Sequence, residues 1–218
     1  MKIYNIEQGS EEWFAIKYGK IGGSTLSEIM TKIDQPVKNT AKYLDILSAH
    51  VERFELDDEY VSSDMERGNL FEPIARSEFE RVYNKKVNQV GWVEMENEIA
   101  GISPDGLIGE FEAIEIKCPA RKKHMSYILD SNMLVCDYIW QIVQYFVVIE
   151  KLEKLYVLSY RPENTIKQMV VVEVTKDMLI SNTKGINKKI SDFIKLANNR
   201  LVELKESIKN DIELLKKF

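Results

Sequence analysis

The stretch SPDGLIGEFEAIEIKCP, residues 103–119, constrains the fold more than any other part of the chain. In EAIEIKC the side chains alternate across a β-strand, so the isoleucines and Cys118 share one face while Glu115 and Lys117 share the other. The proline and glycine of SPDG favour a turn, which lets Asp105 lie beside Glu115 across a short hairpin. We therefore expect a core strand with one apolar face and one charged face.

Two carboxylates that converge with a lysine form an oxygen-rich site of the kind that Mg²⁺ prefers. A lysine beside such an ion can orient a water molecule or help to deprotonate it. The reaction that suits this set is metal-assisted phosphodiester hydrolysis. The alternative is that Asp105 caps a turn while Glu115 and Lys117 form an exposed pair. The turn, the alternation and the apolar flanks together favour the site, because an unpaired charge is costly to bury.

The remaining periodicity predicts a mixed α/β fold. We expect one nuclease domain over 1–218, with N-terminal helices at 10–83, a catalytic core at 86–174 and a C-terminal helix at 175–217. Finer predictions are a helix at 10–18, one from near Ser24, strands in KVNQVGWVEM, IAGIS and EAIEIKC, helices at 121–131 and 135–150, and strands in KLYVLSY and IKQMVVVEV.

Composition excludes several classes of protein. The apolar runs are shorter than a membrane span and the first residues lack the apolar core of a secretory signal, so we expect a soluble, intracellular protein. Cys118 and Cys136 stand alone, which argues against a zinc site or a disulfide framework. The net charge of −5 argues against a uniformly basic nucleic-acid binder, although carboxylates at a metal site would account for part of it.

SPDGL and EIKCP resemble the core of the PD-(D/E)xK nuclease superfamily, and specifically of the phage lambda exonuclease and YqaJ-type viral recombinase family. Three further elements are similar to that family in the same order: QGSEEWFAIKYGKIGGS at 8–24, RGNLFEPIARSEFE at 67–80 and WQIVQYFVVIEKLEKLYVLSY at 140–160. The resemblance implies a restriction-endonuclease-like core, in which helices flank a central mixed β-sheet.

The resemblance also assigns roles to individual residues. It makes Asp105 and Glu115 metal-binding carboxylates, the Ile116 carbonyl a further ligand, and Lys117 the lysine that positions or activates the attacking water. It makes Glu72 a helix-borne acid that helps to bind the metal or its waters. From the residues alone, a glutamate at a helix edge is ordinarily solvated.

Two glutamines of one apolar helix are further candidates. Gln144 occupies the family's glutamine position, near the attacking water or the substrate backbone. Gln141 and Tyr145 spell QxxxY, as in related nucleases, although a polar edge of a core helix would also explain Gln141. Buried glutamines on such a helix need hydrogen-bond partners.

The N-terminal element indicates an anion site. In GKIGGS, two glycines precede a helix for which Ser24 is the expected N-cap, and a helix start offers backbone N–H groups to an anion. In the family, an arginine and a serine here hold the 5′-phosphate of the digested strand. Ser24 matches, whereas Lys17 takes the arginine position and lacks its bidentate fork. Arg121 is a further candidate for a DNA phosphate contact, or a solvated charge.

The resemblance thus implies a phage- or prophage-encoded 5′-to-3′ exonuclease that digests one strand of linear double-stranded DNA and leaves 3′ overhangs for recombination. Two Mg²⁺ ions, with Mn²⁺ as a substitute, a trimeric ring and a single-strand annealing protein as partner are implied with it. Two alternatives stay open: another endonuclease or DNA-end-processing nuclease on the same core, and a non-catalytic DNA-binding or assembly subunit.

Overall fold

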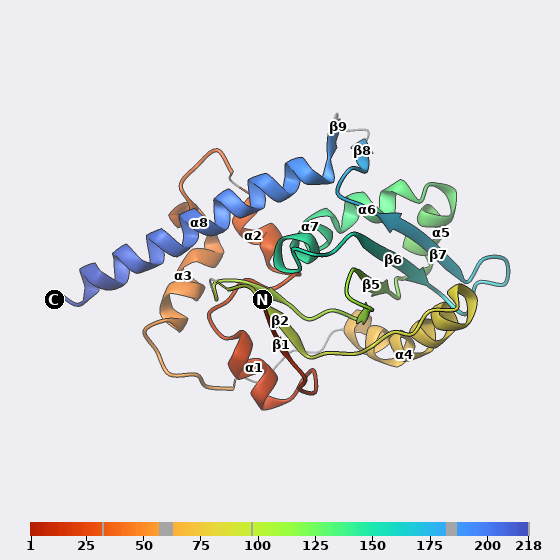
Figure 1. The fold of residues 1–218 in the computed structure, drawn as a ribbon, viewed down its shortest axis with the longest axis horizontal. Coiled ribbons are helices and arrows are strands. Elements are labelled where there is room, and N and C mark those ends of the chain that lie inside the picture. The colour runs from red at the N-terminus through yellow and green to blue at the C-terminus, as the bar shows by residue number, and fades with distance from the viewer. Residues whose placement is uncertain (32, 57–62, 97, 182–186, 218) are drawn as a thin grey trace.

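A four-stranded mixed sheet forms the centre of the protein (Figure 1). The computed structural model describes residues 1–31, 33–56, 63–96, 98–181 and 187–217. The strands are β4 (Gly106–Ile108), β5 (Glu112–Lys117), β6 (Lys154–Tyr160) and β7 (Met169–Val174), in the order β4-β5-β6-β7. β5 and β6 are parallel, and the other two pairs are antiparallel. The predicted α/β class with a mixed central sheet is confirmed.

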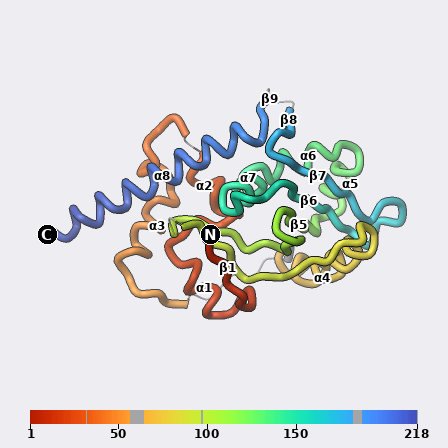
Figure 2. The backbone as a smooth tube through the Cα atoms, viewed as in Figure 1, coloured from red at the N-terminus to blue at the C-terminus, as the bar shows by residue number. Residues whose placement is uncertain are grey.

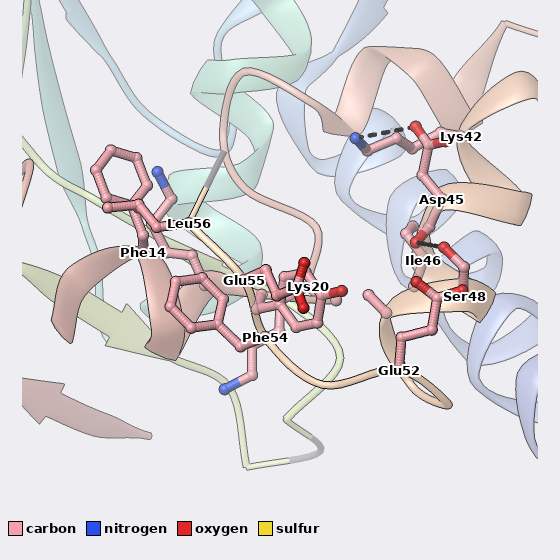
Figure 3. Close-up of a pocket in the computed structure, with 14 residues that line it drawn as sticks. Phe14, Lys20, Lys42, Asp45, Ile46, Ser48, Glu52, Phe54, Glu55 and Leu56 are labelled. Atoms are coloured by element: carbon pink, nitrogen blue, oxygen red, sulfur yellow. Dashed lines mark hydrogen bonds and ion pairs between the residues drawn. The ribbon is translucent and has the colours of Figure 1, made fainter. Parts of the chain in front are cut away.

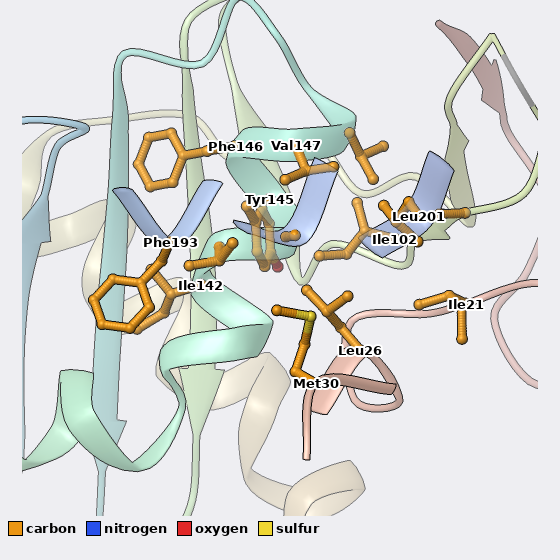
Figure 4. Close-up of a cluster of buried hydrophobic side chains, with 14 of the residues drawn as sticks. Ile21, Leu26, Met30, Ile102, Ile142, Tyr145, Phe146, Val147, Phe193 and Leu201 are labelled. Atoms are coloured by element: carbon orange, nitrogen blue, oxygen red, sulfur yellow. The ribbon is translucent and has the colours of Figure 1, made fainter. Parts of the chain in front are cut away.

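Helices cover both faces of this sheet, as the alternation in β5 requires. On one face, Ile114 and Ile116 pack with Phe79 of α4 (Ser63–Tyr83). On the other face, Ala113 joins the larger core with α7 (Ile139–Val148) and α8 (Ile190–Leu215). Figure 4 shows the meeting of α7, α8 and α2 (Leu26–Met30) in that core. Strand β5 therefore lies between two helical layers.

A second sheet lies beside the first and is formed largely by the N-terminal half. Its strands β1 (Lys2–Tyr4), β2 (Trp92–Glu94) and β3 (Gly101–Ile102) are antiparallel. A bridge between Ile21 and Ala100 joins the segment that follows the first helix to this sheet. The smoothed backbone in Figure 2 follows β1 alongside β2, although about ninety residues of chain separate them.

The first predicted helix is confirmed, and the second begins differently. Helix α1 (Glu11–Lys17) starts at the N-cap Ser10, whose hydroxyl accepts a hydrogen bond from Trp13 N at 3.2 Å. The expected N-cap Ser24 is wrong, because the cap of α2 (Leu26–Met30) is Thr25. A 3₁₀ turn at Val37–Asn39 and helix α3 (Ala41–Ala49) follow.

Three helices occupy the region where two were expected. Helix α5 (Arg121–Leu129) agrees with the prediction at 121–131, whereas the predicted helix at 135–150 is α6 (Asn132–Asp137) followed by α7. The break lies at Tyr138, whose φ of −117° and ψ of 22° depart from helical values.

The C-terminal helix begins later than predicted. Instead of continuing from 175, the chain first forms the pair β8 (Leu179–Ser181) and β9 (Asn187–Lys189), and part of the predicted helix, 182–186, lies outside the described residues. Helix α8 then starts with Lys189 N donating to Asp192 Oδ2 at 3.2 Å. Its far end extends beyond the body of the protein (Figures 1 and 2). None of the described helices has the length and apolar character needed to cross a bilayer.

Candidate active site

Strand β5 places Glu115 and Lys117 together on the face toward α7. Glu115 is 1% exposed, and its Oε1 lies 2.6 Å from Lys117 Nζ. Lys117 Nζ also donates to Gln141 Oε1 at 2.9 Å. The ring of Tyr138 lies 4.6 Å from the same ammonium. The alternation that the sequence predicted thus holds, and the charges meet in a partly closed site rather than in open solvent.

Asp105 enters this site from the turn before β4. Its Oδ2 accepts a hydrogen bond from Ile116 N at 2.5 Å, so the side chain reaches across the hairpin to the C-terminal part of β5. Gly106, the next residue, allows β4 to pack closely on Val87, because a Cβ at this position would lie 2.0 Å from Val87 Cγ1. Asp105, Glu115 and Lys117 therefore lie close together, as the sequence predicted.

Tyr145 of α7 supports both carboxylate-bearing segments. Its hydroxyl donates to Glu115 Oε2 at 2.6 Å and accepts from Asp105 N at 3.2 Å. Gln141 and Tyr145 lie one helical turn apart, so one face of α7 meets the charged face of β5. Tyr145 is fully buried, and burial followed by the charge of Glu115 raises its pKa well above the usual value. The hydroxyl therefore stays protonated and donates.

The electrostatics of the site favour a bound cation. Burial, together with the negative charges of Glu115 and Glu72, raises the pKa of Asp105 well above its ordinary value of 3.8. Burial alone would lower the pKa of Lys117, but the charges of Glu115 and Asp105 outweigh it and the net shift is upward. Lys117 is thus held as an ammonium beside carboxylates that repel one another. A divalent cation would relieve this repulsion.

The residues present fit a magnesium ion that keeps part of its water shell. Within the described residues there is no group of three acidic, histidine or cysteine side chains at metal-binding spacing. Asp105 and Glu115 form a pair, and Mg²⁺ commonly binds one or two carboxylates together with waters and substrate phosphate. The expected ligand role of the Ile116 carbonyl stays a prediction.

Glu72 approaches the site from the opposite face of the sheet, on α4. Its carboxylate forms an ion pair with Arg76, one turn further along the helix. Burial raises the pKa of Glu72, the charge of Arg76 opposes that rise, and the charge of Glu115 adds to it. The influence of Glu115 indicates that the two carboxylates lie within electrostatic range. A cavity of about 710 Å³ adjoins Glu72 and Arg76.

Gln144 does not contact the charged cluster. It is fully buried, and its Nε2 donates to the carbonyl oxygens of Ile21 at 3.2 Å and Gly101 at 3.1 Å. Among the described residues its Oε1 has no hydrogen-bond partner. These contacts tie α7 to the Ile21 segment and β3. The role near the attacking water that was expected for Gln144 stays a prediction, and Gln141 is the glutamine that bonds to Lys117.

Lys17 is linked to the site indirectly, through the side chain of Trp13. Its Nζ is 3.1 Å from the ring centroid of Trp13. The indole N–H of Trp13 bonds to Gly91 O and to Ser103 Oγ, next to the turn that carries Asp105. A cavity of about 500 Å³ opens beside Lys17, between α1, α3 and the segment 52–56 (Figure 3).

Ser24 and Arg121 are both exposed, and their expected contacts with DNA phosphates stay predictions. Ser24 is exposed, and Thr25 Oγ1 accepts from Gly22 N at 2.9 Å, so one N–H of the glycine pair is already bonded. Helix α2 has only five residues, which weakens the anion site expected at its start. Arg121 is exposed at the start of α5. That helix borders the cluster, because Lys123 Nζ lies 5.1 Å from the Tyr138 ring that also meets Lys117.

Comparison with known proteins identifies the family of the chain. Residues 12–151 match the family model described as the YqaJ-like viral recombinase domain. The chain belongs to this family. The family that the sequence motifs resembled is thereby confirmed. No curated protein matches the chain.

Solved structures extend the similarity of this YqaJ-like protein beyond the matched residues. It is similar to LHK-Exo in complex with dAMP, with a TM-score of 0.77 and 23% identity over 95% of this chain and 97% of that one. LHK-Exo, an alkaline exonuclease from Laribacter hongkongensis, gives 0.74 at the same identity and coverage. A phage-related exonuclease from Haemophilus somnus 129PT gives 0.63 at 12% identity, over 91% of this chain and 97% of that one. The fold thus includes the C-terminal strands and α8.

Sequence reasoning missed one residue of the YqaJ-like site. Arg76 is 7% exposed and contacts both Glu72 and the backbone of Asp105, although no role was expected for it. Its spacing of four residues from Glu72, on a predicted helix, was the signal that could have identified it.

Proposed function

We propose that this YqaJ-like protein is a Mg²⁺-dependent 5′-to-3′ exonuclease that digests one strand of linear double-stranded DNA and leaves a 3′ overhang for recombination. The observation that carries the proposal is the junction of Asp105, Glu115 and Lys117 at a buried strand supported by Tyr145. The similar solved structures are exonucleases, which supports the same reaction class.

Asp105 and Glu115 would hold the metal, with the Ile116 carbonyl and Glu72 as further contributors. When bound, the ion supplies Lewis-acid activation of the scissile phosphate and lowers the pKa of the attacking water. Two Mg²⁺ ions, with Mn²⁺ as a substitute, are the form that we propose.

Lys117 would orient the attacking water or a phosphate oxygen through its ammonium hydrogens. Its raised pKa keeps it charged, and its bonds to Glu115 and Gln141 fix its direction. We propose Gln141 and Tyr145 as positioning residues and Gln144 as a support of the core. The partly exposed Lys117 leaves one side of the site open to DNA.

The 5′ end of the strand would lie toward Lys17 and Ser24, and Arg121 would contact a backbone phosphate. Lys17 lies on the side of the Asp105 turn where the Trp13 indole is anchored. We further propose a trimeric ring, a single-strand annealing protein as partner and a cytoplasmic place of action. A ring would reconcile a net charge of −5 with DNA binding, since only its channel need be electropositive.

The test compares three DNA substrates with purified protein and Mg²⁺: linear duplex with 5′-phosphate, linear duplex with 5′-hydroxyl, and closed circles. Progressive loss of one strand from the phosphorylated linear duplex, with circles intact, is the expected result. Nicking of circles would indicate an endonuclease instead. If no DNA is degraded while duplex is still bound, a non-catalytic binding subunit is the better account.

A further inference from the structure

Arg76 is a buried guanidinium on the helix that carries Glu72. Its side chain is 9% exposed. A guanidinium has five N–H donors and no acceptor, and it cannot lose its charge, so burial is tolerable only where several acceptors surround it. The arrangement of these acceptors therefore indicates what Arg76 does.

The acceptors of Arg76 come from three separate segments. Its Nε donates to the carbonyl oxygen of Asp105 at 3.0 Å. Its Nη2 donates to Glu72 Oε1. The hydrogen-bonding surroundings assign the amide oxygen of Gln89 to the side of Arg76, where it accepts from Nη1 at 3.1 Å and Nη2 at 3.2 Å. Helix α4, the turn before β4 and the segment before β2 are thus joined by one side chain.

The peptide groups on either side of the Asp105 Cα are held from opposite faces of the sheet. The N–H of Asp105 donates to Tyr145 Oη of α7 at 3.2 Å, and its C=O accepts from Arg76 of α4 at 3.0 Å. The carboxylate between them is directed at Ile116 N. Because α4 and α7 pack on different faces, the turn is clamped rather than supported from one side only.

We propose that Arg76 is a positioning residue that fixes the carboxylate of Glu72 relative to that of Asp105, and so sets the affinity of the site for Mg²⁺. The inference rests on the proposed metal site. The donors of Arg76 are directed to protein acceptors, which makes it a support for the metal-binding residues rather than a phosphate ligand. Loss of such outer contacts typically lowers metal affinity by about 10- to 100-fold.

The surroundings of Arg76 make it suited to substitution. Arg76, Glu72 and Gln89 line the cavity of about 710 Å³ together with Gln8 and Asn69. A shorter side chain at position 76 would leave room that water can fill, because the lining is polar. Arg81 offers a matched control, since it lies on the same helix and pairs with Glu78 but is 70% exposed.

The experiment measures Mg²⁺ and Mn²⁺ binding to the DNA-free protein by calorimetry, and the Mg²⁺ midpoint for digestion of linear duplex. We expect Arg76→Gln to raise the dissociation constant and the midpoint by about tenfold or more. Arg76→Lys should fail to restore either value, because a point charge cannot reach three acceptors in a plane. Arg81→Gln should leave both values unchanged.

Wild-type metal affinity in both Arg76 variants would overturn the proposal, even if the variants were less stable. If Arg76→Gln does not fold, Arg76→Lys and Gln89→Ala take its place, and a wild-type dissociation constant in both overturns it equally. Absence of metal binding by the wild-type protein also overturns it. If the wild-type protein binds metal, Arg76→Gln weakens that binding, and the wild-type protein still leaves DNA intact, the proposed nuclease function alone is rejected.

Discussion

Tyr145→Phe removes one oxygen atom that joins the two carboxylate-bearing segments of the site. The hydroxyl donates to Glu115 Oε2 at 2.6 Å and accepts from Asp105 N at 3.2 Å, and both Tyr145 and Glu115 are buried. The substitution leaves the ring in place, so apolar packing changes little. Its effect therefore measures the hydrogen bonds rather than a cavity.

The expected cost follows from these two bonds. A hydrogen bond to a charged group contributes about 1.5–3 kcal/mol, and a buried N–H without a partner costs about 1–3 kcal/mol. Because the two bonds share one oxygen and are not additive, we expect the free energy of unfolding to fall by about 3 kcal/mol. For a chain of this size that corresponds to a melting temperature lower by about 6–12 °C.

The assay is thermal unfolding followed by circular dichroism, in EDTA so that metal binding does not contribute. Tyr127→Phe is the matched control, because Tyr127 is equally buried but donates to Asp137, whose side chain is 38% exposed. We expect the control to lose only about 1 kcal/mol. If Tyr145→Phe melts within about 2 °C of the wild type, or no lower than Tyr127→Phe, the reasoning about the shared hydroxyl is refuted.

Three further predictions concern pH and specificity. Asp105→Asn should stabilise the metal-free protein at neutral pH. Burial and nearby carboxylates raise the pKa of Asp105, so the wild type loses stability as the pH rises above about 4. Thermal unfolding in EDTA at several pH values tests this, and an equal dependence of stability on pH in the two proteins would contradict it. Burial lowers the pKa of His124, whose ring bonds to Ser159 Oγ, so the free energy of unfolding should fall as the pH drops below about 6.5. Urea unfolding at two pH values should show a smaller loss of stability in His124→Asn than in the wild type. An identical loss would exclude His124 as its cause. Lys17→Arg should raise the ratio of digestion rates on 5′-phosphate and 5′-hydroxyl duplex severalfold, because a guanidinium binds phosphate through two parallel bonds; an unchanged ratio argues against contact with the 5′ end.

The central strand could be predicted because its alternation and its turn depend only on residues that are close together in the sequence. Alternation in β5 follows from backbone geometry, and the turn residues before β4 fix a short hairpin. Together they bring Asp105 to Glu115 without reference to distant parts of the chain. The spacing of Arg76 from Glu72 could indicate an ion pair between them, but the contact of Arg76 with the Asp105 backbone depends on how α4 packs on the sheet.

The surroundings of the two glutamines of α7 could not be told apart from the sequence. Gln141 and Gln144 are three residues apart, so their side chains lie only about 60° apart around the helix axis, and spacing alone does not tell which of them meets β5. The helix is apolar on nearly all sides, so its pattern does not reveal which face meets β5. The one orienting signal is Tyr145, four residues after Gln141, because the pair must share a face.

The other differences arise from tertiary structure overriding local preference. The region after 175 has helical periodicity, yet β8 pairs with β9 before α8 begins. Asn132 Nδ2 donates to the carbonyl oxygen of Ser181 at the end of β8, which ties this hairpin to α6. A contact between residues so far apart in the chain cannot be predicted from the local pattern of apolar and polar residues.

The central claim is that the cluster of Asp105, Glu115 and Lys117 hydrolyses DNA. The most direct test is the rate at which Lys117→Ala digests 5′-phosphorylated linear duplex at saturating Mg²⁺, with Lys122→Ala, an exposed lysine of α5, as the control. We predict that Lys117→Ala lowers the rate by about 100-fold or more while Lys122→Ala digests at the wild-type rate. A wild-type rate in Lys117→Ala would contradict the account.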